Sequence, residues 1–165
     1  MNKTDGKHEK AELSFMVNGK PVTVRAYAME RLLDVLRNET GLIGTKEGCG
    51  EGECGSCSVL MDGKLVNSCL IPALQANGAE IVTVEGLAGD GHICALQQAF
   101  LEYGGAQCGI CTPGMLLAAR QLLDKHPNPS LDDIRDGLAG NLCRCTGYMQ
   151  IFEAVMDAAR REAAR

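Results

Sequence analysis

Residues 48–57 read GCGEGECGSC, and a fourth cysteine, Cys69, follows after eleven further residues. The first three cysteines have the C-x4-C-x2-C spacing of plant-type [2Fe–2S] proteins. Glycines stand between them, and a loop bent this tightly around a cluster needs positive φ angles, which glycine adopts without a Cβ penalty. A structural zinc site more often uses two C-x2–4-C knuckles. The stretch therefore predicts an iron–sulfur cluster rather than a zinc ion.

A second cysteine set lies further along the chain, as Cys108-x2-Cys111 and Cys143-x-Cys145. On its own this set fits either iron or zinc, because C-x2-C is also a common zinc knuckle. The ninth cysteine, Cys94, lies in a helical pattern and is interpreted as a small buried apolar residue. An odd cysteine count without an export signal argues against a secreted disulfide scaffold. Eight cysteines thus form two groups of four.

Composition narrows the class of protein further. The chain has 165 residues and a formal net charge of −5, so it lacks the basic surplus that would neutralise nucleic-acid phosphates. No apolar run approaches the roughly 18 residues that a membrane span needs. The first ten residues are polar and contain no signal-peptide core, so we expect a cytoplasmic protein.

The N-terminal half has the period-two pattern of a β-sheet. Two hairpin signals, Asn18-Gly19 and Asp62-Gly63, each connect two apolar runs. A helical repeat lies between the hairpins and ends at Gly41. The expected elements are strands at 13–17, 21–25, 58–61, 64–66 and 80–84 and a helix at 32–36. Together they predict a small mixed sheet packed on one helix.

The C-terminal half changes to helical periodicity. One apolar face carries Ile93, Leu96, Phe100 and Tyr103. Three further helices are expected: one with Thr112 as N-cap and Pro113 after it, one opened by a capping box at Ser130 with Asp133, and one over 149–163. If the four helices run up-down-up-down, the loops after the first and the third lie at the same end. The four cysteines of the second group would then meet there.

Three motifs together resemble a known family. They are Gly48 to Cys57, Gln107-Cys108-Gly109-Ile110-Cys111-Thr112-Pro113-Gly114, and Gly140-Asn141-Leu142-Cys143-Arg144-Cys145-Thr146-Gly147-Tyr148. They are similar to the iron–sulfur subunit of the xanthine dehydrogenase family of molybdenum hydroxylases, over about residues 13–159. The sequence departs from the family pattern at Ile110, Ser56 and Ser58, none of which is a cysteine.

This resemblance implies an α+β chain with two [2Fe–2S] clusters. Residues 1–88 would form a plant-ferredoxin-like β-grasp domain, and residues 89–165 a four-helix bundle domain. The implied ligands are Cys49, Cys54, Cys57 and Cys69 in the first domain and Cys108, Cys111, Cys143 and Cys145 in the second. Gln107 would contact the pterin. Arg144 would either offset cluster charge or be solvated, and both interpretations stay open.

The resemblance also implies partners and a role. The helical-domain cluster would lie beside the molybdopterin of a large subunit and the other cluster would face FAD in a medium subunit, in a dimer of heterotrimers. The chain would relay electrons one at a time between these cofactors, and it would be inactive alone. Two alternatives remain: a zinc-stabilised structural module and a freely diffusing ferredoxin.

Overall fold

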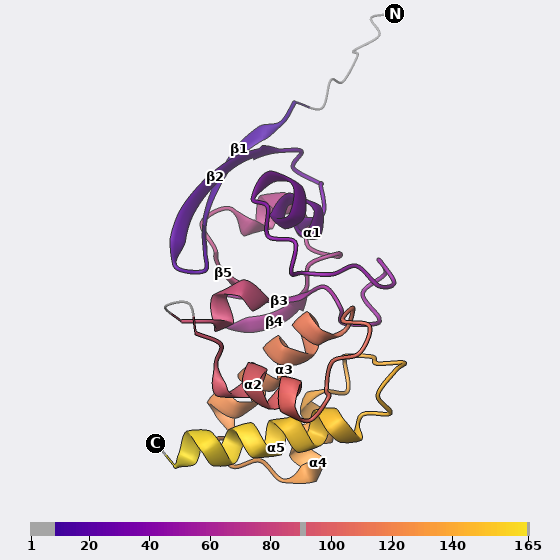
Figure 1. The fold of residues 1–165 in the computed structure, drawn as a ribbon. Helices are drawn as coiled ribbons and strands as arrows, with labels where there is room; N and C mark the ends of the chain where they lie inside the picture. The colour runs from indigo at the N-terminus through magenta and orange to yellow at the C-terminus, as the bar shows by residue number, and fades with distance from the viewer. Residues whose placement is uncertain (1–8, 90–91, 165) are drawn as a thin grey trace, which may run out of the picture.

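The computed structural model describes residues 9–89 and 92–164 (Figure 1). Its first elements are β1 (Ala11–Val17) and β2 (Lys20–Ala26), an antiparallel hairpin in register from Ala11 opposite Ala26 to Val17 opposite Lys20. The turn uses positive φ at Asn18 (50°) and Gly19 (74°), as an Asn-Gly hairpin requires. The expected hairpin is therefore confirmed.

Five strands form one mixed sheet in the order β2-β1-β5-β3-β4. β3 (Ser58–Met61) and β4 (Lys64–Asn67) form the second expected hairpin, and β5 (Glu80–Val82) pairs parallel to β1 and antiparallel to β3. The prediction that the last strand reaches residue 84 is wrong. Thr83 donates its backbone N–H to Asn18 Oδ1 (2.9 Å) instead of a strand partner, and the 3₁₀ turn η3 (Val84–Leu87) follows.

The helix expected at 32–36 has two parts, α1 (Leu32–Asp34) and a π-helical turn η1 (Val35–Glu39). The π turn is closed by the Thr40 N–H bonded to Val35 O at 3.2 Å. Gly41 (φ 73°) ends the helical segment, as predicted. Leu32, Val35 and Leu36 are fully buried against the sheet, with the 3₁₀ turn η2 (Ala73–Ala76) beside them. The N-terminal half thus has its own core.

Four helices follow: α2 (Ala95–Glu102), α3 (Thr112–Lys125), α4 (Leu131–Gly137) and α5 (Met149–Ala163). The limits of α5 are those predicted from sequence. Two members of the apolar face predicted for the first helix lie outside it: Ile93 precedes α2, Tyr103 caps its C-terminus, and both are exposed. Cys94, predicted within this helix, is its half-buried N-cap, whose N–H bonds to Gln97 Oε1 at 2.9 Å.

Two helix starts test the capping predictions. Ser130 and Asp133 form the expected capping box, with Ser130 N to Asp133 Oδ2 at 2.8 Å and Asp133 N to Ser130 Oγ at 3.2 Å. The N-cap of α3 is Cys111 rather than Thr112, because Cys111 O already accepts the first helical bond from Met115 N (2.9 Å). The helix therefore begins directly at a cysteine of the second group.

The two halves meet where α3 packs on the β3–β4 hairpin, in the middle of the molecule (Figure 1). Within the C-terminal half, α2 packs mainly against α5. None of the helices in the described ranges is long and apolar enough to cross a membrane. The loops that carry the cysteines lie beside the junction of the two halves.

Candidate metal centres

The first cysteine loop is shaped by glycines. Gly50, Gly52 and Gly55 have φ angles of 73°, 80° and 69°, as the sequence predicts. Leu70 lies so close to Gly52 that a Cβ there would stand 2.2 Å from Leu70 Cδ1. The missing side chain therefore lets the segment that carries Cys69 approach the loop.

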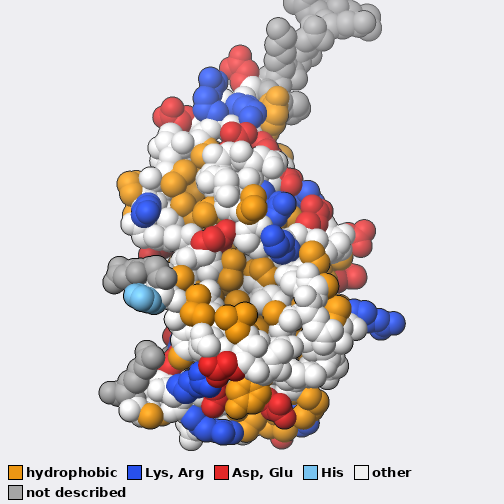
Figure 2. Space-filling view, viewed as in Figure 1, with side chains coloured by type: hydrophobic (Ala, Val, Ile, Leu, Met, Phe, Trp, Pro, Cys, Tyr) orange, Lys and Arg blue, Asp and Glu red, His pale blue; other side chains and the backbone are white. Residues whose placement is uncertain are grey.

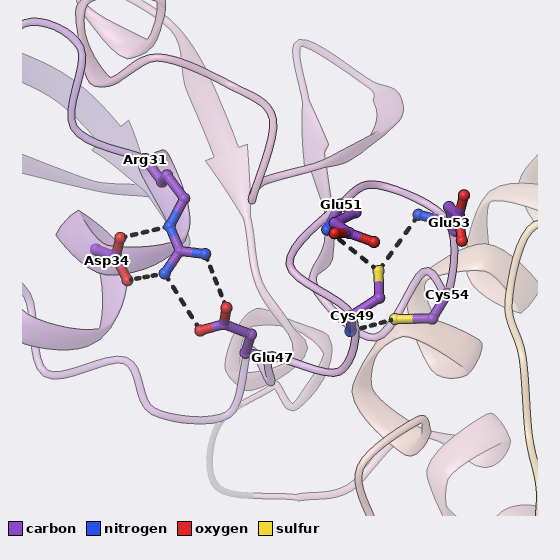
Figure 3. Close-up of polar contacts among 7 residues, drawn as sticks. All are labelled: Arg31, Asp34, Glu47, Cys49, Glu51, Glu53 and Cys54. Atoms are coloured by element: carbon purple, nitrogen blue, oxygen red, sulfur yellow. Dashed lines mark hydrogen bonds and ion pairs between the residues drawn. The ribbon is translucent and has the colours of Figure 1, made fainter.

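Backbone amides of this loop point at cysteine sulfur. Cys49 Sγ accepts from Glu51 N (3.3 Å) and Glu53 N (3.4 Å), and Cys49 N donates to Cys54 Sγ at 3.3 Å (Figure 3). The amide of Glu51, followed by those of Cys54 and Glu53, lowers the pKa of Cys49 to about 7. The amides of the loop thus stabilise the thiolate form of Cys49, which is the form that binds a metal.

The other two cysteines of the first group are buried together. Cys57 is 2% exposed and Cys69 is 4% exposed. Burial, and then the neighbouring Cys57 thiol, raises the pKa of Cys69 to about 11. The first group therefore divides into a pair nearer the surface, Cys49 with Cys54, and a buried pair, Cys57 with Cys69.

The second group is assembled from two loops. Cys108 and Cys111 lie between α2 and α3, and Cys143 and Cys145 lie between α4 and α5. Burial, and then the Cys143 thiol, raises the pKa of Cys111 to about 12. The hydrogen-bonded Cys108 thiol raises the pKa of Cys145, and these two residues are exposed. The structure therefore brings the two loops together so that Cys108 and Cys145 form an exposed pair and Cys111 and Cys143 a buried pair. The first group is divided in the same way.

Hydroxyl groups, in addition to amides, lie near Cys143. Thr146 Oγ1 is 3.2 Å from Cys143 Sγ, and the Tyr148 hydroxyl accepts from Cys143 N at 3.0 Å. Burial acts to raise the pKa of Cys143, but Thr146 and neighbouring amides outweigh it, so the pKa is lowered. Tyr148 takes a left-handed conformation (φ 72°), unusual for a bulky residue. Sequence reasoning assigned no role to either hydroxyl, although both lie in the third motif.

The two cysteine loops touch each other. Leu142 N donates to Cys54 O (2.9 Å), and the buried Asn141 donates Nδ2 to Gly55 O (2.9 Å). A Cβ at Gly114 would stand 2.1 Å from Gly55 O, so only glycine allows the start of α3 to come this close. Backbone atoms next to a cysteine of each group are therefore in direct contact.

The donor set fits a pair of two-iron clusters. In the described ranges, no three His, Cys, Asp or Glu side chains converge as they would around one metal ion, whereas each group presents its thiols two by two. A [2Fe–2S] cluster takes four thiolates across two irons. Thr112 Oγ1 is buried, one residue from Cys111, and has no hydrogen-bond partner among the residues described. It is an uncommitted donor beside the second group.

The remaining candidates lie as follows. Gln107 is exposed in the loop next to Cys108, and Arg144 is exposed between Cys143 and Cys145. Cys94 belongs to neither group. Histidines take no part in either set among the residues described, and His8 lies outside them.

Comparisons with known proteins match both halves of the chain. The model of a 2Fe-2S iron–sulfur cluster binding domain matches residues 15–88, and that of a [2Fe-2S] binding domain matches residues 83–156. The small FeS subunit of nicotinate dehydrogenase from Eubacterium barkeri is 48% identical over 92% of this chain and 97% of its own. The iron-sulfur-binding subunit of xanthine dehydrogenase from Escherichia coli is 47% identical over 86% of this chain and 89% of its own.

Solved structures give the same result. A chain of quinoline 2-oxidoreductase from Pseudomonas putida 86 superposes with a TM-score of 0.91 at 47% identity, covering 95% of this chain and 97% of that one. Aldehyde oxidoreductase from Desulfovibrio gigas superposes with a TM-score of 0.88 at 43% identity, over 93% of this chain and 17% of the longer protein. The α+β fold with a ferredoxin-like domain is thus confirmed.

Proposed function

Because the chain belongs to the small iron–sulfur subunits of the xanthine dehydrogenase family of molybdenum hydroxylases, we infer that it is the electron-transfer subunit of such an oxidoreductase. It relays electrons between a molybdopterin centre in a large subunit and FAD in a medium subunit. Bound [2Fe–2S] clusters supply one-electron redox chemistry, and the chain supplies their position, hydrogen bonds and burial.

The ligand assignment is part of this proposal. Cys49, Cys54, Cys57 and Cys69 would hold the first cluster, and Cys108, Cys111, Cys143 and Cys145 the second. The pairwise contacts of the thiols and the amides directed at Cys49 support the first set. The contacts between thiols of the two loops support the second. Residues 1–88 as a β-grasp domain and residues 89–165 as a four-helix bundle complete the proposed architecture.

The observation that carries the relay function is the contact between the two cysteine loops. Cys54 O accepts from Leu142 N, and Leu142 is bonded to Cys143, so one hydrogen bond connects a ligand of each proposed cluster. Asn141 and the close approach of Gly114 to Gly55 hold that contact. An unrelated pair of metal sites would have no need of so tight a junction.

Exposure indicates where the partner subunits would bind. Cys108 and Cys145 form the outer pair of the second group, with exposed Ile110 (43%) and Leu142 (53%) and with Gln107 in the same loops. We assign this apolar rim to the molybdopterin subunit, with Gln107 toward the pterin. The exposed Cys49, in the loop whose Gly52 lies against Leu70 (59% exposed), would face the FAD subunit. Apolar side chains also gather across the middle of the face in Figure 2.

A dimer of heterotrimers and a cytoplasmic location belong to the same proposal. The cytoplasm keeps cysteine thiols reduced and therefore available as cluster ligands. Co-purification with two larger subunits tests the assembly. A protein that purifies alone would instead support the freely diffusing ferredoxin.

The first experiment is metal and sulfide analysis of the protein isolated from its native host, together with a visible spectrum. We expect about four irons and four sulfides per chain and a red-brown colour, because each [2Fe–2S] cluster has two of each. A colourless protein with about two zinc ions would overturn the proposal in favour of a structural module. Molybdenum in the same sample would identify the complex.

A further inference from the structure

Arg31 lies between two carboxylates beside the first cysteine loop (Figure 3). It occupies the N-cap position of α1. Its Nε and Nη2 donate to the two oxygens of Asp34 at 2.7 and 2.9 Å, and its Nη1 and Nη2 donate to those of Glu47 at 2.8 and 3.2 Å. Both carboxylates are thus held in the two-point geometry that suits a planar guanidinium.

Glu47 connects this ion cluster to the cysteine loop. It stands two residues before Cys49, and a Cβ at Gly50 would lie 2.9 Å from Glu47 Oε1 and 3.5 Å from Arg31 Nη1. The charged groups therefore lie directly against the backbone that follows Cys49. The left-handed conformation of Gly50 (φ 73°) and its missing side chain make this approach possible.

The loop that precedes the cysteines is held by two side chains, Arg37 of η1 and Glu85 of η3. Arg37 Nη1 donates to Ile43 O (3.0 Å) and Thr45 O (2.7 Å), while Glu85 Oε1 accepts from Gly44 N at 2.7 Å. These contacts fix residues 43–45 through the backbone. Arg31 differs because it holds a side chain charge, that of Glu47, next to the proposed cluster.

Electrostatics gives Arg31 and Glu47 opposite effects on that cluster. A [2Fe–2S] core with four thiolates is negative overall, and reduction adds another electron. A nearby cation therefore stabilises the reduced form and a nearby carboxylate destabilises it. The side chains are 37% and 45% exposed, so solvent weakens both effects but does not abolish them.

We propose that Arg31 is a positioning residue for the first cluster, which fixes Glu47 against the Cys49–Gly50 backbone and raises the reduction potential of the cluster by its charge. This rests on the proposed assignment of Cys49, Cys54, Cys57 and Cys69 as ligands. A purely structural ion pair would act differently, because loss of either partner would then disturb the loop in the same way.

The test compares Arg31→Gln, Glu47→Gln and the double variant in the full-length protein, purified from its host with the subunits that accompany it. Midpoint potentials of both clusters are measured by redox titration followed by electron paramagnetic resonance. At a fixed potential, we expect the reduced-to-oxidised ratio of the first cluster to fall about threefold to tenfold in Arg31→Gln, tenfold being 59 mV for one electron. The ratio should rise in Glu47→Gln and return toward wild type in the double variant.

Controls separate the possible failures. Arg135→Gln removes an arginine from a surface ion pair with Asp132 on α4 and should leave the potential of the first cluster unchanged. Arg31→Lys keeps the charge and should retain the wild-type potential more closely than Arg31→Gln. If Arg31→Gln does not load iron, the proposal is tested by Glu47→Gln, in which the ratio must rise, and by Arg31→Lys, in which it must stay near the wild-type value. Shifts of equal sign in the two single variants, or none, would overturn the proposal. Wild-type protein without the first cluster would overturn the ligand assignment instead.

Discussion

The two cysteine groups reach the same arrangement by different routes. The first group lies within residues 49–69, where glycines with positive φ bend the chain and backbone amides donate to Cys49. The second group joins two loops separated by helices, and hydroxyls of Thr146 and Tyr148 bond to Cys143. Each ends as one outer and one buried pair of thiols. Local chain geometry builds the first site, and helix packing builds the second.

Loss of a buried cysteine should have the largest effect and should show whether the sites are independent. We expect Cys69→Ser to lose the first cluster and Cys143→Ser the second, so iron falls from about four to about two per chain in each. Cys94→Ser, at the spare cysteine, should keep about four. Iron analysis and paramagnetic resonance spectra measure this, and loss of both clusters from one substitution would contradict separate sites.

The next largest effect is expected from a substitution at the contact between the two cysteine loops. In Gly114→Ala the new Cβ would meet Gly55 O at 2.1 Å, a backbone atom that cannot move aside without shifting the first loop. We expect about 2–4 kcal/mol lower stability in chemical unfolding. The matched control is Gly140→Ala, because a Cβ there meets nothing within 4 Å among the residues described and φ is not positive. It should change stability by less than about 0.5 kcal/mol.

A smaller loss is expected at Asn141. Asn141→Ala removes the buried bond to Gly55 O and should cost about 0.5–1.5 kcal/mol, because that carbonyl still accepts from Ser58 Oγ at 2.7 Å and from Ser58 N at 3.0 Å. The magnetic interaction between the two reduced clusters should also weaken, because this bond holds the loops together. An unchanged spectrum with lowered stability would restrict Asn141 to a structural role.

The smallest effect concerns the capping box that starts α4. Hydrogen bonds from the Ser130 side chain, then from its amide, lower the pKa of Asp133. A carboxyl with a lowered folded-state pKa contributes stability above its unfolded value, and that contribution is lost as pH falls through the folded value. The stability difference between wild type and Asp133→Asn should therefore be present at neutral pH and vanish in strong acid. Thermal unfolding at several pH values measures it, and a difference that persists in acid would contradict this origin.

Sequence alone was sufficient for most local patterns. The Asn18-Gly19 turn, the capping box at Ser130 and the limits of α5 all agree with expectation, because each depends on neighbouring residues. One error occurred where a distant residue competes for a backbone group: Asn18 takes the N–H of Thr83 and ends β5 early. The other error is local, because Cys111 O accepts the first helical bond and so makes Cys111, one residue before Thr112, the N-cap of α3.

For the candidate sites, the sequence identified the eight cysteines and divided them into two groups, because ligand types and spacings are written along the chain. It also indicated the family through three motifs. The tertiary structure decided which thiols face each other, how the loops meet at Gly55, Gly114 and Asn141, and that Arg31 reaches Glu47. These contacts join residues far apart in sequence, so they exist only once the helices and the sheet have packed.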